Sequence, residues 1–410
     1  MSRRRRVVVT GLGVCSPLGM EIGEFWENSL NGRSCVRPIK NFEVDRGFSR
    51  IAAFVDGFPE DSLFGLQGPS REKDRTYRMA LYCIERAFES AHISEPEFKT
   101  SCGLYISSAI GQMGDMESYF LPAFECNDFT LESFSFGSLT GRLASHFGLR
   151  GGHMLIPTGC VGGCDAVSYA ADLIRYGLSE RVLAGAAEAP ITPLVVAAFG
   201  RIGANSTRDC APEEASCPFD KRRDGFVLAE GAAVLLLESE TSALARGARI
   251  QAEIAGTGSI NNCCHMTDIS PGGEAIAEAC QLALKDAECR PAEIDFISAH
   301  GSSTPQNDVA ESVALRKTFG NSLDRIPVTS LKSQCGHALS AANAIEIVST
   351  ICSIEHSEIP PTINLQEQDP ACVVNIVAGR SLRVPVHKAL KVSSGFSGIH
   401  TAVVLSEYQG

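Results

Sequence analysis

Short apolar runs that end in glycine or another small residue recur along this chain and most constrain how it can fold. The clearest are residues 6–13, 103–109, 153–159, 181–188 and 231–239. Their apolar residues are consecutive and do not alternate with polar ones, which is typical of buried strands in a sheet covered on both faces. Between them, residues 73–91 have the spacing of an amphipathic helix, with Met79, Cys83 and Ala87 on one stripe. This alternation predicts an α/β fold.

The same order of elements recurs after residue 250. Residues 250–258 match the first strand, and residues 272–287 match the first long helix. Residues 294–301 match the strand that leads to Cys160, and residues 389–407 read as a closing hairpin. A repeated pattern of this kind indicates an internal duplication. We therefore predict two halves, 1–249 and 250–410. Because no low-complexity linker separates the halves, we expect them to pack as one body.

Charge and cysteine content narrow the classes of function. The 410 residues carry a net charge of -12 with a pI near 5.3, which disfavours binding to nucleic acid or to an anionic membrane surface. No apolar stretch reaches the roughly 18 to 20 residues that cross a bilayer. The run Arg3–Arg6 resembles the start of an export signal, but glycine, proline and acidic residues interrupt the pattern, so we interpret it as a solvated end.

The 16 cysteines are scattered through apolar segments, which indicates a reduced, cytoplasmic interior and not a secreted disulfide framework. The Cys-Cys-His run at residues 263–265 has no second pair of ligands at zinc spacing. No metal site is therefore predicted.

Cys160 lies in the stretch IPTGCVGGCDAV, where an apolar strand gives way to a helical pattern at residues 161–177. An isolated cysteine is most often a small buried hydrophobe. At a helix N-terminus, however, free backbone N–H groups and the helix dipole favour the thiolate, and we expect Gly162 and Gly163 to leave the backbone open for a ligand. Cys164 is one helical turn away, where disulfide geometry is rarely right, so we interpret it as packing.

Two histidines stand at junctions between predicted elements. His300 ends an apolar run before the loop GSSTPQND, and His337 precedes an apolar helix. Each alone is equally consistent with a buried structural histidine. A nucleophilic cysteine needs a base or a hydrogen-bond donor. His300 stands at a strand-to-loop junction and His337 at a loop-to-helix junction in one half, while Cys160 ends a strand in the other. This arrangement favours a shared site.

Four motifs, in this order along the chain, resemble those of the β-ketoacyl synthases, condensing enzymes of the thiolase superfamily. They are TGCVGG (158–163), AHGSSTPQND (299–308), KSQCGHALSAANAIE (332–346) and SSGFSGI (393–399). The resemblance extends from end to end through GLGVCSPLG (11–19), ITPLVVAAFGRIGANSTR (191–208), PFDKRRDGFVLAEGAAVLLLE (218–238) and PPTINL (360–365). Finer details resemble the ketosynthase alpha subunit of type II aromatic polyketide synthases. These are Gly159, CDAV (164–167), QND (306–308) and SGF (394–396).

The resemblance implies a decarboxylative Claisen condensation. Cys160 would carry the growing acyl chain as a thioester, and His300 and His337, as neutral hydrogen-bond donors, would stabilise the enolate formed from a malonyl thioester. The backbone N–H groups of Cys160 and Phe396 would hold the tetrahedral oxyanion, and Phe396 would also gate the acyl pocket. Lys332 would give electrostatic support, paired with Glu311, or form a structural ion pair.

Two residues depart from the family pattern near the gate. Ser397 stands where the family commonly has Gly, and His400 stands where it has Asn or Gln. A side chain at position 397 would restrict the turn if that residue needs a positive φ. The resemblance therefore leaves the motion of the gate open while it implies the reaction class.

The fold implied by the resemblance is the thiolase fold, two similar α/β halves in five αβαβα layers with the active site between them. The implied partners are a chain length factor in a heterodimer and an acyl carrier protein, whose 4′-phosphopantetheine carries the substrates. The chain itself would bind no cofactor and no metal. Candidate cations for docking the carrier protein are Arg71, Lys73, Arg75, Arg201 and Arg208.

Other functions remain open at this point. A fatty-acid elongating 3-oxoacyl-[acyl-carrier-protein] synthase II-like homodimer would use the same chemistry. A non-catalytic chain length factor would normally lack the cysteine that this chain has at position 160. A degradative thiolase would use one His and a second Cys near the C-terminus, which the two-histidine pattern does not fit.

Overall fold

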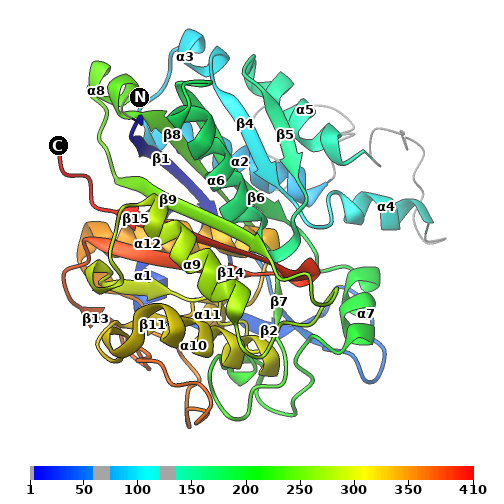
Figure 1. Ribbon diagram of the computed structural model, residues 1–410. Coiled ribbons are helices and arrows are strands. Elements are labelled where there is room, and N and C mark those ends of the chain that lie inside the picture. The colour runs from blue at the N-terminus through cyan, green and yellow to red at the C-terminus, as the bar shows by residue number, and fades with distance from the viewer. Residues whose placement is uncertain (1–3, 59–73, 121–134) are drawn as a thin grey trace.

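One central ten-stranded sheet organises the chain (Figure 1). The structure, a computed structural model, describes residues 4–58, 74–120 and 135–410. The strands of the sheet are β1 (Val7–Cys15), β4 (Gly103–Ser107), β5 (His153–Ile156), β6 (Arg181–Glu188), β8 (Gly231–Ser239), β9 (Ala252–Asn261), β10 (Phe296–Ser298), β11 (Val328–Thr329), β14 (Lys388–Ser394) and β15 (Ile399–Ser406). Smaller sheets contain β2 (Val36–Pro38), β3 (Ile51–Ala53) and β7 (Leu228–Ala229), and β12 (Glu358–Ile359) and β13 (Leu382–Arg383).

The strand order is the same in both halves when each is read inward from its edge. It runs β5-β4-β6-β8-β1 on one side and β11-β10-β14-β15-β9 on the other. In each half the first three strands are parallel and the rest antiparallel. β1 and β9 join the halves through the antiparallel pairs Val8–Glu253 and Val9–Ala252. The predicted duplication of α/β halves is thus visible in the sheet.

One predicted match between the halves is wrong. The segment 294–301 was expected to correspond to the strand before Cys160, which is β5. Instead β10 occupies the position of β4, and β11 occupies the position of β5. β11 has only two residues, which is too short for a periodic signal in the sequence.

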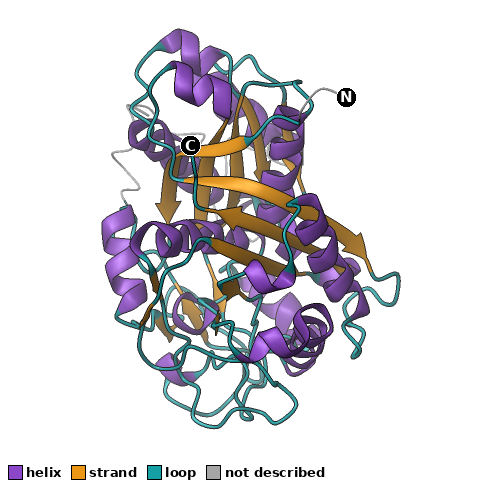
Figure 2. Cartoon of the chain, turned by 60° about the vertical axis from the view of Figure 1, so that its left-hand side comes forward, coloured by secondary structure: helices purple, strands orange, loops and turns teal. Residues whose placement is uncertain are grey.

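Helices cover both faces of the strands, as Figure 2 shows. α6 (Gly162–Arg175) and α12 (Ser340–His356) lie between the halves and contact strands of both. α2 (Arg75–Ser90) and α5 (Phe136–Phe147) pack on the outside of the first half, α9 (Glu274–Asp286) packs on the second, and α10 (Pro305–Phe319) packs on α9. This is the expected five-layer arrangement. The remaining helices are α1 (Ile22–Leu30), α3 (Pro96–Thr100), α4 (Met113–Phe120), α7 (Pro193–Ile202), α8 (Glu240–Ala245) and α11 (Lys332–Cys335).

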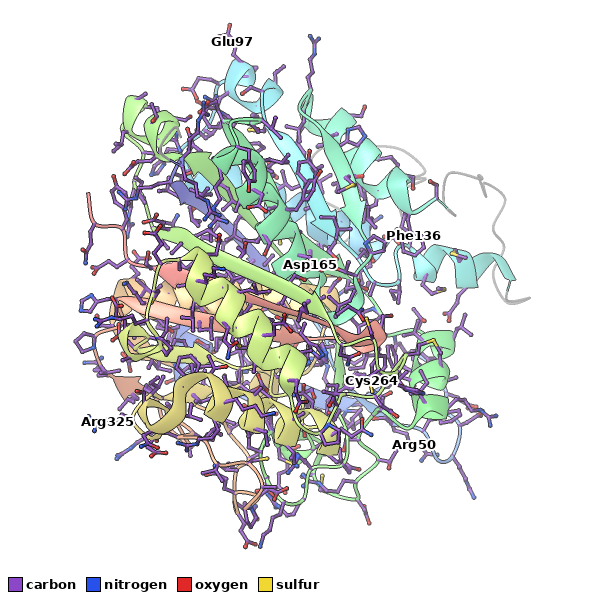
Figure 3. All side chains as sticks on the ribbon, in the orientation of Figure 1. Arg50, Glu97, Phe136, Asp165, Cys264 and Arg325 are labelled. Atoms are coloured by element: carbon purple, nitrogen blue, oxygen red, sulfur yellow. The ribbon has the colours of Figure 1, made fainter. Side chains whose placement is uncertain are left out.

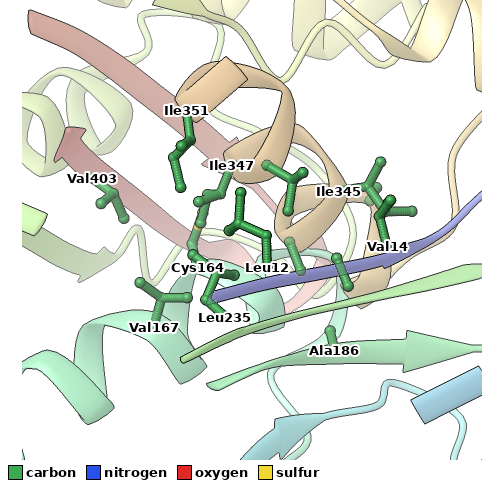
Figure 4. Close-up of a cluster of buried hydrophobic side chains, with 14 of the residues drawn as sticks. Leu12, Val14, Cys164, Val167, Ala186, Leu235, Ile345, Ile347, Ile351 and Val403 are labelled. Carbon is green, nitrogen blue, oxygen red and sulfur yellow. The ribbon is translucent and has the colours of Figure 1, made fainter. Parts of the chain in front are cut away.

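The interior of the molecule is built around the two central helices (Figure 4). Cys164 of α6 packs among apolar side chains that include Leu12 of β1 and Ile347 of α12, and all three are buried. The predicted packing role of Cys164 is therefore confirmed. Burial of a side chain such as Leu or Ile stabilises the fold by about 1.5–3 kcal/mol. Within the three described ranges, no helix is long and apolar enough to span a membrane.

Gly162 and Gly163 do not leave the backbone open for a ligand, contrary to the prediction. A Cβ at Gly162 would lie 1.8 Å from the Ser107 Oγ atom of β4. A Cβ at Gly163 would lie 2.6 Å from the backbone nitrogen of Ala344 and 2.7 Å from the Ser340 carbonyl oxygen, both in α12. The two glycines are needed because α6 approaches α12 and β4 too closely for any side chain.

This close approach predicts the effect of adding one methyl group. Gly163→Ala forces α6 away from α12, and we expect the free energy of unfolding to fall by about 1–3 kcal/mol because the core is overpacked. Gly23→Ala in α1 is the matched control, since a Cβ there meets nothing within 4 Å and alanine favours a helix. Thermal denaturation of both variants checks this, and an unchanged midpoint for Gly163→Ala would show that the helices can separate freely.

Candidate active site

Cys160 lies in a 3-10 turn, η2 (Gly159–Val161), between β5 and the N-terminus of α6. Gly159 turns the chain with a φ of 62°, a conformation that glycine adopts without strain. The Cys160 carbonyl accepts a hydrogen bond from Asn343 Nδ2 of α12. The close contact of the two central helices therefore fixes the backbone of Cys160.

The thiol of Cys160 is held largely in its protonated form. Burial raises its pKa to about 11. The Lys332 ammonium and the backbone N–H groups of Phe396 and Cys160 act in the opposite direction. The groups predicted to favour the thiolate at this helix N-terminus are present, but loss of water around the sulfur outweighs them.

His300 and His337 face each other across the site, with ring centroids 5.2 Å apart and planes at 79°. His300 follows β10, and its backbone N–H donates to Glu311 Oε1 at 2.6 Å. His337 precedes α12, and its backbone N–H donates to the Val227 carbonyl at 2.7 Å. Both residues are buried. The two predicted histidines are thus brought together by backbone anchors from different elements.

Both imidazoles are neutral in this environment. Burial lowers the pKa of His300 and of His337 well below the ordinary value, and the positive charge of Lys332 lowers both further. In the part of the chain that the structure describes, the Nδ1 atom of neither ring has a hydrogen-bond partner. Buried polar atoms without partners are uncommon in native proteins, and a catalytic role is one reason for them.

Lys332 does not pair with Glu311, and this predicted pairing is wrong. Its Nζ atom lies 2.6 Å from Glu346 Oε1 and donates to the His300 carbonyl at 2.8 Å. Glu311 instead accepts from the N–H groups of His300 and Gly301, at 2.6 and 2.8 Å, and burial raises the pKa of its carboxyl to about 7. Both side chains therefore act on the backbone that carries His300, Lys332 from one side and Glu311 from the other.

Phe396 lies in a second 3-10 turn, η6 (Phe396–Gly398), between β14 and β15. Its ring centroid is 6.3 Å from that of Phe199, which is 5.4 Å from Phe226, and Phe226 is 5.2 Å from His337. Cys160 and Phe396 both pack at the edge of an apolar cluster formed in part by Val195 of α7. The rings of Phe396, Phe199 and Phe226 form an apolar wall from the predicted gate to His337. Such a surface can bind an acyl chain.

Ser397 adopts the positive φ that the sequence left open. Its φ is 69°, its N–H donates to the Met266 carbonyl at 2.6 Å, and its carbonyl accepts from Asn261 Nδ2 at 2.7 Å. Asn261 is the last residue of β9, and Met266 lies in the loop after it, which also carries the exposed Cys264 (Figure 3). The turn beside Phe396 is therefore tied to the end of β9 and to the loop that follows it.

His400 is buried one strand position beyond this turn. Burial lowers its pKa to about 4, so the ring is neutral near pH 7. Its Nδ1 atom lies 3.1 Å from Ser394 Oγ. His400 therefore supports the base of the turn through Ser394.

The candidate docking cations have different surroundings. The Arg75 guanidinium is paired with Glu230 at 2.7 Å, and Arg208 donates to the carbonyl of Glu214. Arg201 is exposed at the end of α7. Arg71 and Lys73 lie outside the described residues. Among the described candidates, only Arg201 presents its charge to solvent without a carboxylate or carbonyl partner.

Comparison with known proteins matches the chain from end to end. Residues 4–243 match the β-ketoacyl synthase N-terminal domain, and residues 251–366 match the β-ketoacyl synthase C-terminal domain. The chain belongs to the β-ketoacyl synthase family. It is an acyltransferase-type condensing enzyme. Cys160, His300 and His337 are the candidates for its catalytic residues.

Two curated relatives cover nearly the whole of this β-ketoacyl synthase. The tetracenomycin polyketide synthase ketoacyl synthase alpha subunit of Streptomyces glaucescens is 36% identical, over 98% of this chain and 97% of its own. The 3-oxoacyl-[acyl-carrier-protein] synthase 2 of Synechocystis sp. is 34% identical, over 99% of each. Identity alone therefore does not separate the two kinds of synthase.

Two solved structures share the thiolase-type fold of this synthase. A type II polyketide synthase acyl carrier protein in complex with its ketosynthase, bound to the hexaketide, has a TM-score of 0.91 and 40% identity, over 99% of this chain and 100% of that one. The ishigamide ketosynthase/chain length factor has a TM-score of 0.91 and 33% identity, over the same shares. The predicted fold class is confirmed.

The backbone of Ser397 predicts a stabilising substitution. Ser397→Gly removes the cost of holding a residue with a side chain in the left-handed backbone conformation, about 1–2 kcal/mol. It also raises the conformational entropy of the unfolded chain, which lowers stability by about 0.4–1 kcal/mol. We expect a net gain of about 0.5 kcal/mol in the free energy of unfolding, whereas Ser101→Gly, where φ is -83°, should lower it. Chemical denaturation distinguishes the two, and equal losses would contradict the assigned strain.

Proposed function

We propose that this β-ketoacyl synthase is the catalytic ketosynthase subunit of a type II polyketide synthase, acting in the cytoplasm. The observation that carries the proposal is that one ammonium group, that of Lys332, lies close enough to the Cys160 thiol and to both imidazoles to lower the pKa of all three. Cys160 and Phe396 also pack at the same apolar cluster, and the N–H groups of both act on the Cys160 thiol. The relatives named for polyketide ketosynthases support the subfamily. The family matches at 4–243 and 251–366 support a division into halves 1–249 and 250–410.

In the first step, Cys160 takes the acyl chain from the phosphopantetheine thiol of an acyl carrier protein. The sulfur of Cys160 forms a new bond to the acyl carbonyl carbon, and the bond from that carbon to the pantetheine sulfur breaks. The Cys160 thiol, whose pKa burial raises to about 11, gives up its proton as the sulfur attacks, and the leaving pantetheine sulfur takes up one proton, so the exchange balances. A covalent intermediate divides the condensation into two easier steps.

In the second step, malonyl on a carrier protein loses carbon dioxide. The electron pair of the broken bond becomes an enolate, whose oxygen accepts hydrogen bonds from the neutral rings of His300 and His337. Because this charge appears only in the transition state and after it, preorganised donors lower the barrier more than they stabilise the substrate. Lys332 supports the site through the His300 carbonyl and its positive charge.

The enolate carbon then attacks the Cys160 thioester. The N–H groups of Cys160 and Phe396 hold the oxyanion of the tetrahedral intermediate, which collapses to the β-ketoacyl carrier protein. The Cys160 thiolate leaves and takes a proton from water. Phe396 gates entry to the sulfur in this proposal, which its packing beside Phe199, at the apolar cluster that Cys160 also contacts, supports.

We propose a heterodimer with a chain length factor and transient docking of the carrier protein near Arg201. The solved ketosynthase/chain length factor and the ketosynthase in complex with its carrier protein support these partners. The cofactor of the reaction, 4′-phosphopantetheine, would arrive on the carrier protein. The second candidate is a fatty-acid elongating 3-oxoacyl-[acyl-carrier-protein] synthase II-like homodimer. The Synechocystis relative, a 3-oxoacyl-[acyl-carrier-protein] synthase 2, supports this class of enzyme.

Reconstitution tests which of the two functions holds. The chain is incubated with malonyl-loaded carrier protein, with and without a chain length factor, and the products are identified by mass. We expect poly-β-keto products only when the chain length factor is present. Elongation of saturated acyl carriers by the chain alone would instead establish the fatty-acid function.

Replacing the sulfur should separate the two chemical steps. In Cys160→Ala we expect the rate of condensation to fall by more than about a thousandfold, because no thiol remains to hold the acyl chain as a thioester. Malonyl decarboxylation should persist, since its donors are intact, whereas His337→Ala should lower it by about 10²–10³. Cys289→Ala, beside α9, is the control for loss of a thiol. Release of labelled carbon dioxide measures decarboxylation, and the mass of the products measures condensation. Loss of both activities in Cys160→Ala would contradict the division of roles.

A further inference from the structure

Lys391 is a second buried lysine beneath the site. It lies on β14 and its side chain is 0% exposed. Its Nζ atom is 2.7 Å from Glu346 Oε2, and it donates to the carbonyls of Val392 at 2.7 Å, Ala299 at 3.1 Å and Ser298 at 3.4 Å. An ammonium group has three hydrogens, and the three carbonyls accept them. Burial lowers the pKa of Lys391, but the Glu346 carboxylate opposes this effect, and a neutral amine would leave a lone pair facing an oxygen, so these contacts favour the charged form.

Lys391 and Lys332 share a single carboxylate. Lys332 Nζ lies 2.6 Å from Glu346 Oε1, on the other oxygen of the same group. The two ammonium groups also bind consecutive carbonyls at the end of β10, since Lys391 binds Ala299 and Lys332 binds His300. One carboxylate between two cations leaves one positive charge beside the strand end that carries His300, and Glu311, whose pKa burial raises to about 7, balances that charge only in part.

Such an excess charge is costly to bury, which argues for a use. We infer that Lys391 is a second positioning residue of the active site, which holds the end of β10 and, with Lys332, places positive charge beside His300 and His337. The inference rests on the proposed function, because neutral imidazoles are needed there as hydrogen-bond donors.

The charged and titratable groups that face this cluster come from every element packed around it. They are Lys332 of α11, Glu346 of α12, Glu311 of α10, Cys164 of α6, His400 of β15, and His300 and His337. Lys391 lowers the pKa of His300 and of His337 and also that of Glu311. Removing its charge should therefore raise the pKa of both imidazoles, so that they become protonated at higher pH.

The test uses Lys391→Met in the full chain with its carrier protein. We expect the acid limb of the malonyl decarboxylation profile to move up by about one pH unit, the usual effect of losing a nearby charge. Lys388→Met is the matched control on the same strand, because Lys388 pairs with Glu293 at the surface and should leave the profile unchanged. Lys391→Gln, which keeps two donors but no charge, should behave like Lys391→Met and serves if the latter does not fold.

A double variant separates charge from tethering. Lys391→Met with Glu346→Gln removes one positive and one negative charge, so the acid limb should return to within about 0.3 pH units of the unmodified chain, although both contacts are lost. A purely structural Lys391 would give a double variant at least as impaired as the single one, with no return of the limb. That outcome overturns the inference.

A readout without turnover distinguishes failure of this inference from failure of the proposed function. The ring signals of His300 and His337 are followed by NMR against pH in the free chain and in Lys391→Met. We expect the midpoints of both histidines to be higher in the variant. Identical curves in the two proteins overturn the role of Lys391 even if condensation is observed. An absence of condensation together with shifted midpoints overturns only the proposed function.

Discussion

The contact between α6 and α12 is the constraint on which the site depends. Gly162 and Gly163 allow the two helices to touch at backbone distance, with strands of both halves around them. Cys160 precedes one helix and His337 the other, and Asn343 ties the Cys160 carbonyl to α12. Because cores are close-packed and hard to deform, a shift of either helix would carry the sulfur and the imidazoles apart. The packing of the interior is thus what holds the start of α6, from the first half, against α12, from the second.

Burial acts on the site in two directions that suit the proposed chemistry. It raises the pKa of the Cys160 thiol and lowers that of His300 and His337, since water no longer stabilises any charged form. The buried lysines lower the pKa of the imidazoles further. On the thiol, the charge of Lys332 acts against burial, because it lowers the pKa that burial raises. The result is a site in which the nucleophile and both donors are neutral at rest, and charge develops only where N–H groups and cations face it.

The sequence predicts the parts of this structure that rest on local pattern. Continuous apolar runs identified the long strands, and the junctions at Cys160, His300 and His337 indicated a shared site. β11 was missed because two residues carry no periodicity, and Glu311 was paired with Lys332 because spacing does not tell which acid faces a lysine. Glu346 and Lys391 each stand in a largely apolar segment. Because a buried charge needs a partner, a charged residue in such a segment indicates a buried ion pair. The pairing itself depends on tertiary contacts between α12 and β14.

The turn at Phe396 lies where the proposed gate would act on the proposed nucleophile. The Phe396 N–H that would hold the oxyanion also acts to lower the pKa of Cys160 in the resting site. A turn that moved outward to admit an acyl chain would withdraw this group, so the thiol would be most firmly protonated while the gate is open. Return of the turn would restore the N–H for the tetrahedral oxyanion. Ser397, at positive φ, ties the turn to Met266 and Asn261. One backbone segment would therefore control both access to the sulfur and the electrostatics that activate it.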